Sequence, residues 1–273
     1  MTGRRLSAAH LRDRLSERDM AVLGSLDQLR LATGDQIRRL YVADGSALTQ
    51  ARRTRALLQR LSELGAVVRM DRSVGGIRAG SQGYVYGIAG LGQAVLTLDA
   101  PAARRHRRTW ETSPAHQNHV LAITELYVSL VEVARGGLIE LLDFQPEPIC
   151  WRTFSGHAGE PVTLKPDAFI RLGVGDVERS AFVEVDLSTE SRTVIARKAR
   201  TYASYWQTGL EAQRHGVFPE VLWLVPDERR QTRMREVLGR LPANAQELFA
   251  VERRADALPY LSTLPAAWTE AAR

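Results

Sequence analysis

The chain has 273 residues, of which 44% are hydrophobic and 25% are charged, a composition typical of a folded protein with room for two domains. No apolar run approaches the roughly 20 residues that a membrane helix needs, and the first residues lack the apolar core of a signal peptide. We therefore expect a cytoplasmic protein without a membrane partner. The single cysteine, Cys150, excludes an internal disulfide and a zinc site built from several cysteines.

Charge is distributed unevenly along the chain. Residues 1–115 hold 19 arginines and 10 acidic residues, a net charge of +9, whereas residues 116–273 hold 18 basic and 21 acidic residues, a net charge of −3. Because nucleic acids are polyanions, this asymmetry predicts a nucleic-acid-binding module joined to a second domain. The expected limits are 1–98 for the module, 99–115 for a basic linker, and 116–273 for the second domain.

Three helices are predicted in the first module. Ser16 is a typical N-cap for a helix over about 17–30, whose apolar residues recur at helical spacing. The turn at Thr33 precedes a short second helix around 37–41. The third helix is expected to end at Gly65, with Leu48, Leu58 and Leu61 among the residues of its apolar face.

After Gly65 the apolar residues alternate, which predicts strands over 66–70 and 84–88 and a short helix over 91–96. Three helices followed by a hairpin with a glycine-rich, basic tip resemble a winged helix-turn-helix DNA-binding domain over about 15–98. In such domains the third helix enters the major groove and the hairpin meets phosphates. The resemblance implies that the following arginines contact DNA: Arg52, Arg53, Arg55, Arg60, Arg69, Arg72 and Arg78. The alternative is a unit that contacts protein, with the arginines forming a solvated face.

The second half of the chain alternates between helical and strand patterns. Helices are predicted over 116–134 and 190–207, and strands over 138–144, 164–172, 181–187 and 221–225. The element order is therefore α-β-β-β-α-β in a protein of mixed α/β class. Residues 151–162 hold no clear element and are predicted to form a loop. Residues 231–273 are predicted to form a helix and a short terminal extension.

Carboxylates interrupt the apolar strands of this half. Alternation places Glu184 and Asp186 on one face of their strand, and Asp167 lies on the preceding strand. Carboxylates in so apolar a setting are costly unless they meet a metal, a basic group or hydrogen-bond donors. Only two of the 37 basic residues are lysines. Lys198 is expected on the sheet-facing side of the following helix, and Lys165 beside the site.

The element order and these carboxylates resemble the PD-(D/E)XK nuclease-like fold. That resemblance implies that Asp167, Glu184 and Asp186 bind Mg²⁺ or Mn²⁺ and that Lys198 assists phosphodiester hydrolysis. The chain departs from the family pattern because Asp186 stands where a lysine is usual. A structural salt-bridged cluster of Glu184 and Asp186 with Lys198 and Arg197 would explain these residues equally well.

Two further features bear on the function. Glu125, on the first helix of the second domain, is either an additional acidic ligand or a surface residue. Over about 15–230, the module, linker and core resemble the replication-relaxation family of plasmids and integrative elements, most specifically over 182–205. The resemblance implies a role in DNA replication, relaxation or transfer, with duplex DNA and replication or transfer machinery as partners.

Two functions of different classes remain open at this point. The first is a metal-dependent DNA nickase or endonuclease that docks through the winged helix. The second is a non-catalytic DNA-binding replication accessory or transcriptional regulator, whose second domain forms a homodimer or binds a partner.

Overall fold

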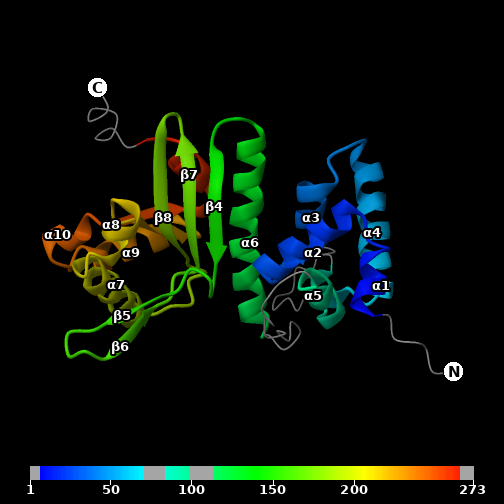
Figure 1. The fold of residues 1–273 in the computed structure, drawn as a ribbon. Helices are drawn as coiled ribbons and strands as arrows, with labels where there is room; N and C mark the ends of the chain where they lie inside the picture. The colour runs from blue at the N-terminus through cyan, green and yellow to red at the C-terminus, as the bar shows by residue number, and fades with distance from the viewer. Residues whose placement is uncertain (1–6, 71–83, 99–112, 265–273) are drawn as a thin grey trace. The chain divides into compact units, whose positions relative to one another are not determined.

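The computed structural model describes residues 7–70, 84–98 and 113–264 (Figure 1). Its helices and sheets, one of them mixed, confirm the expected α/β class. Contacts divide the chain into two compact units, Met1–Val128 and Ser129–Arg273, a division that falls later than the expected limit at residue 115. Within the described ranges, no helix has the length and apolar character needed to cross a membrane.

Unit 1 contains a small sheet and several helices. The helices are α1 (Ala8–Arg12), α2 (Glu17–Leu29), α3 (Gly34–Tyr41), α4 (Ala47–Glu63) and α5 (Gly90–Leu96). The strands are β1 (Leu31–Thr33), β2 (Val67–Met70) and β3 (Val85–Ile88), which pair antiparallel in the order β1-β3-β2. The three predicted helices, both hairpin strands and the closing helix are all present. Two short elements, α1 and β1, were not predicted because neither is long enough to show a period.

Local hydrogen bonds explain where the first helices begin. The Ser16 hydroxyl caps α2 by accepting from the backbone N–H of Asp19, and the Ser16 N–H donates in return to the Asp19 carboxylate, while Thr33 and Gln36 form the same capping box at α3. The core beneath them includes Leu23, Leu58 and Leu61. The prediction for Leu48 was wrong, since its side chain is 78% exposed. It lies in the first turn of α4, six residues before the first buried residue of that helix, Thr54.

The long helix α6 (Pro114–Arg135) contributes its first half to unit 1. Val120 and Leu121 pack with Leu31 and Val85 in an apolar cluster. The hydroxyl of Thr124 donates to the carbonyl of Leu31 at 2.8 Å. This half of α6 is therefore part of the packing of the small domain.

Unit 2 is built on a five-stranded sheet in the order β10-β9-β8-β7-β4. Its strands are β4 (Glu140–Pro146), β7 (Ala168–Val174), β8 (Val177–Val185), β9 (Glu220–Val225) and β10 (Phe249–Arg253). The first three are antiparallel neighbours, whereas β8, β9 and β10 run parallel. Along the chain the predicted order α-β-β-β-α-β is present, beginning with α6, most of which belongs to unit 1, and additional elements are inserted and appended.

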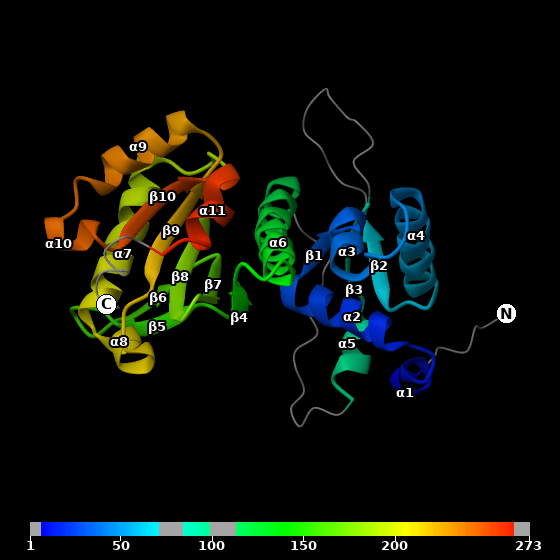
Figure 2. The same cartoon turned by 90° about the horizontal axis from the view of Figure 1, so that it is seen from above.

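The helices of unit 2 connect the parallel strands or follow the last of them. They are α7 (Arg192–Gln207), α8 (Leu210–His215), α9 (Glu228–Leu238), α10 (Ala243–Gln246), the 3-10 turn η1 (Arg254–Asp256) and α11 (Ala257–Leu261). Both α7 and α9 cover the same face of the sheet (Figures 1 and 2). Their apolar residues share one core with strand residues that include Phe169, Phe182 and Trp223.

Two sequence predictions for the residues before β7 were wrong. Residues 151–162 are not a loop, because β5 (Arg152–Ser155) pairs with β6 (Pro161–Leu164) in an antiparallel hairpin. Only Phe154 and Leu164 of this hairpin are buried, so its alternation was too weak to detect. The strand predicted over 164–172 is interrupted at Pro166, which has no N–H to donate to a ladder.

The C-terminal segment was predicted as helix, yet it supplies the parallel strand β10. Arg179, on β8, fastens the end of this segment. Its guanidinium donates to the carbonyls of Tyr260 and Thr263 at 2.6 and 2.9 Å and pairs with Glu220 at 2.7 Å. The C-terminal segment therefore supplies the edge strand of the sheet, and Arg179 holds the end of that segment against β8.

Candidate functional site

Glu184 lies near the end of β8, directly opposite Trp223 on β9. Its side chain is only 1% exposed, and two residues of α7 bind it. Lys198 Nζ lies 2.5 Å from Glu184 Oε2, and the Tyr202 hydroxyl donates to Glu184 Oε1 at 2.6 Å. The expectation that Lys198 faces the sheet is confirmed.

The loop from β8 and the start of α7 bring these groups together. Ser191 caps α7 by accepting from the N–H of Val194, which fixes where the helix begins. Lys198 and Tyr202 are four residues apart and so lie on one face of the helix. Ser188, in the connecting loop, has φ of 63°, a left-handed conformation that a serine rarely adopts. The chain thus turns sharply between its buried carboxylates and the helix that binds them.

Burial raises the pKa of Glu184 to about 8, because desolvation and the nearby Asp167 outweigh the opposing effects of Lys198 and Tyr202. Burial also favours the neutral form of Lys198, but Glu184, Asp167 and Glu190 reverse this and raise its pKa above the ordinary lysine value. Lys198 therefore stays charged at neutral pH.

Asp167 directly precedes β7, and its side chain lies close to the end of β8 that carries Glu184. Its Oδ2 accepts a hydrogen bond of 2.7 Å from the backbone N–H of Val185. Behind it, the buried thiol of Cys150 donates to the carbonyl of Pro166 at 3.0 Å. Burial, with the charges of Asp167 and Glu184, raises the pKa of this thiol and so disfavours the thiolate form.

Asp186 has a different partner from the one expected. Arg230, in the first turn of α9, binds it with two hydrogen bonds of 2.6 and 2.9 Å and also donates to the carbonyl of Glu190 at 2.8 Å. Arg197, the partner suggested by the sequence, is exposed and makes no ion pair within the described ranges. Parallel strands end at one edge of a sheet, so the start of the helix after β9 was a signal that could have identified Arg230.

The three predicted metal ligands do not form a common ligand group. Across the residues that the structure describes, no three His, Cys, Asp or Glu side chains gather closely enough to hold an ion. Arg230 takes both oxygens of Asp186, and Lys198 and Tyr202 take those of Glu184. In this arrangement protein cations and donors satisfy the carboxylates, and a metal would have to displace them. Lys165 Nζ lies 4.7 Å from the centre of the Trp151 ring.

The second candidate site is the outer face of α4 in unit 1. Arg52, Arg53 and Arg55 are exposed, and none of them forms an ion pair in the described part of the chain. Arg60 differs, since it is bound to the buried carboxylate of Asp19. On β2, the guanidinium of Arg69 lies 4.3 Å from the centre of the Tyr84 ring. Arg72 and Arg78 lie outside the described residues.

Glu125 is held within unit 1. Arg39 Nη1 lies 2.5 Å from its Oε1, and the amide of Gln36 donates to its Oε2 at 3.0 Å. Its carboxylate is about half exposed. The interpretation as a surface residue fits these contacts, and the interpretation as an additional metal ligand does not.

The sequence matches a known protein family over most of its length. The family described as Replication-relaxation matches residues 23–221. This chain belongs to the replication-relaxation family. No match was found among curated proteins or among solved structures. The match spans α4, Glu184 and Lys198 but ends before Arg230.

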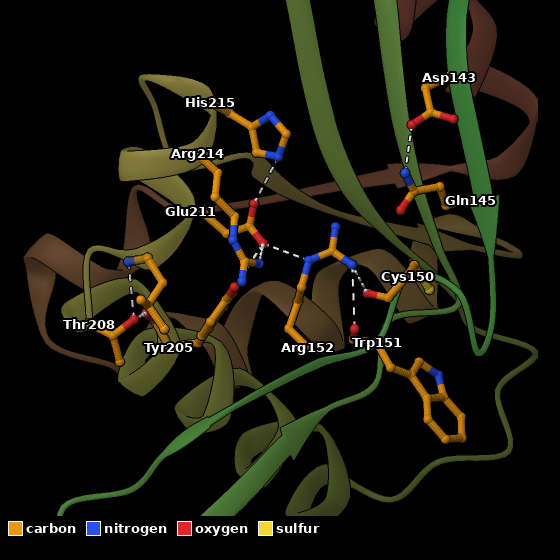
Figure 3. Close-up of polar contacts among 11 residues, drawn as sticks. Asp143, Gln145, Cys150, Trp151, Arg152, Tyr205, Thr208, Glu211, Arg214 and His215 are labelled. Carbon is orange, nitrogen blue, oxygen red and sulfur yellow. Dashed lines mark hydrogen bonds and ion pairs between the residues drawn. The ribbon is translucent and has the colours of Figure 1, made fainter.

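A further buried cluster lies inside the stretch that matches the replication-relaxation model. Glu211, at the start of α8, is fully buried and accepts from Arg152 Nε at 2.6 Å and from the Tyr205 hydroxyl at 2.7 Å. His215 Nε2 lies 3.4 Å from its other oxygen. Figure 3 shows Arg152 reaching from the β5–β6 hairpin to this carboxylate. The cluster ties the hairpin to the helical layer through Glu211 Oε1, whereas Glu211 Oε2 has no hydrogen-bond partner among the described residues.

Proposed function

We propose that the protein is a DNA-binding protein that acts in the replication or relaxation of a plasmid or mobile element. The exposed arginines of α4 carry this proposal, because they are charged groups without a carboxylate partner on the helix that a winged helix presents to the major groove. Arg52, Arg53 and Arg55 would bind phosphates or base edges, and Arg69 would add a contact from the hairpin. Membership of the replication-relaxation family supports the proposed role.

Leu48 adds a candidate contact to bases. It is the exposed apolar residue at the start of α4, where a recognition helix meets base edges. An apolar side chain there can contact the methyl group of thymine. Replacing it by serine should change the preference among DNA sequences without altering the dependence of affinity on salt, and a selection from random duplexes would measure this.

The DNA-binding proposal is tested by measuring duplex affinity against salt concentration. The variant Arg52→Gln/Arg53→Gln/Arg55→Gln should lower the salt slope by about 3, since each lost phosphate contact lowers it by about 0.9. The variant Arg12→Gln/Arg14→Gln/Arg18→Gln removes the same charge from exposed positions near α1 and α2 and serves as a matched control. Equal loss of affinity in both variants would contradict a specific role for α4.

Unit 2 is best interpreted as a core that supports a dimer or partner surface. Each carboxylate of the predicted catalytic set has a protein donor, which favours a structural role. Metal-dependent nicking is the second candidate. One observation in its favour is that Asp167 and Lys198 are both close enough to Glu184, at the end of β8, to shift its pKa. A second is the α-β-β-β-α-β order of elements, which resembles that of nuclease-like proteins.

Nicking of supercoiled plasmid separates these two candidates. An enzyme would nick DNA with Mg²⁺ or Mn²⁺, and Asp167→Ala would abolish the nicking while leaving DNA affinity within a few-fold. A structural core would show no nicking with either metal. Titration calorimetry with the same metals, on wild type and Glu184→Gln, provides an independent measurement, since heat lost in the variant would assign metal binding to this site.

A further inference from the structure

The helices α7 and α9 concentrate positive charge in a half of the chain that is otherwise acidic. Together they carry eight basic and two acidic residues, a net charge of +6, although residues 116–273 have a net charge of −3. Both helices lie on the same face of the sheet (Figures 1 and 2). Their outward sides therefore contribute to one outer surface of unit 2.

Four of the eight basic side chains are explained by partners within the unit. Lys198 and Arg230 bind the buried carboxylates of Glu184 and Asp186. At the margin, Arg192 lies 3.5 Å from Glu236, and Arg235 lies 3.4 Å from Glu252. These four residues are engaged in holding the layer together.

The remaining four are exposed, and within the described ranges their side chains make no hydrogen bond or ion pair: Arg197, Arg200, Arg229 and Arg233. Two lie three residues apart on α7, and two lie four residues apart on α9, so each pair projects from one side of its helix. Like charges at this spacing destabilise a helix by a few tenths of a kcal/mol. A bound polyanion would reverse that repulsion.

The position of Arg229 points in the same direction. It lies in the first turn of α9, where the helix dipole disfavours a positive charge. Arg230, its neighbour, is stabilised there by Asp186, but Arg229 has no such partner. Asp227 and Glu228 complement the dipole at this end and are the acidic residues nearest to Arg229 in the chain.

We propose, on the basis of the DNA-binding function proposed above, that Arg197, Arg200, Arg229 and Arg233 form a second surface that binds the phosphate backbone of duplex DNA. Proteins that bind single strands stack bases on exposed aromatic rings. The aromatic residues of α7 are buried or half-buried, and α9 has none. A surface of guanidinium groups without stacking rings fits a duplex backbone and reads no sequence.

The experiment uses the full chain and a fluorescent DNA duplex, with affinity measured from about 50 to 200 mM salt. The variant Arg197→Gln/Arg200→Gln/Arg229→Gln/Arg233→Gln should lower the salt slope by about 3 to 4. Wild type would then lose up to about 100-fold more affinity than the variant over this range. The control variant Arg135→Gln/Arg171→Gln/Arg253→Gln/Arg254→Gln removes the same charge outside the two helices and should keep the wild-type slope. Unchanged thermal melting of the α7/α9 variant would show that it folds.

The outcomes separate this surface from the α4 proposal. Equal slopes for the α7/α9 variant and its control would overturn the surface, as would a loss confined to an RNA duplex of the same sequence. If the α4 variant loses binding while the α7/α9 variant does not, the DNA-binding function stands and the second surface falls. If the reverse holds, the surface stands and the role of α4 falls. A wild-type protein that binds no duplex would overturn both.

Discussion

The two units use charged side chains differently. Among the described residues, unit 1 buries one charged side chain, Asp19, whereas unit 2 buries five: Asp167, Arg179, Glu184, Asp186 and Glu211. In unit 1, the arginines of α4 remain exposed to solvent, while in unit 2 the five buried charged groups have protein partners. Removing a charge should therefore change stability most in the core of unit 2 and change affinity most on exposed helix faces.

The largest loss of stability is expected for Arg230→Gln. This change leaves Asp186 buried and without its guanidinium, which should lower the free energy of unfolding by about 3–5 kcal/mol. Denaturant unfolding measures the effect. The control Arg229→Gln changes the adjacent exposed arginine and should stay within about 0.5 kcal/mol of wild type. Similar free energies of unfolding for the two variants would show that the buried Asp186 carboxylate is not destabilised by the loss of Arg230.

A pH-dependent difference is expected at Glu184. Its pKa is raised from 4.5 to about 8 in the folded state, so the folded protein binds a proton that the unfolded chain has already released between these values. Stability from this group is present below pH 4.5 and is lost as pH rises towards 8, by about 1 kcal/mol per pH unit. Unfolding experiments across this range should show the decline in wild type but not in Glu184→Gln. Parallel curves would contradict the raised pKa.

An intermediate effect is expected for Arg60→Gln in unit 1. Burial alone would raise the pKa of Asp19, but hydrogen bonds from Arg60 and Ser16 outweigh it and lower the pKa overall. Because the bonds from Ser16 remain in the variant, the loss should be about 1–2 kcal/mol, smaller than for Arg230. Arg55→Gln, on the same helix, is the control for denaturant unfolding and should have little effect.

The smallest effect on stability is expected for the outer face of α4. The variant Arg52→Gln/Arg53→Gln should unfold within about 0.5 kcal/mol of wild type, because no carboxylate depends on these side chains. Its DNA affinity should nonetheless fall. A large loss of stability would show that these arginines support the fold and would remove the contrast between the two units.

Sequence reasoning worked where the information is local. Ser16 and Thr33 predicted helix starts, and the spacing from Glu184 to Lys198 predicted that α7 would place a lysine against the sheet. Contacts between distant residues were missed because no local period encodes them. The pairing of Asp186 with Arg230 spans 44 residues and depends on two parallel strands ending together.

The remaining wrong predictions concern short strands and the burial of one helix residue, Leu48. The β5–β6 hairpin and β10 have too few buried apolar residues to stand out from a loop or a helix. The exposure of Leu48 was missed for a related reason, since helical spacing shows which residues share a face but not where the core beneath that face ends.

The parallel strand β10 has a consequence for the order in which the protein is completed. Chains are synthesised from the N-terminus, and domains fold as they emerge. All the contacts within unit 1 are available once residue 128 has been made, whereas Asp186 lacks Arg230 until α9 begins, and β9 keeps an unpaired edge until β10 has followed. An unpaired strand edge is a template for association with other chains. The yield of correctly folded protein should therefore depend on the last strand of the sheet, which forms after the first unit is complete.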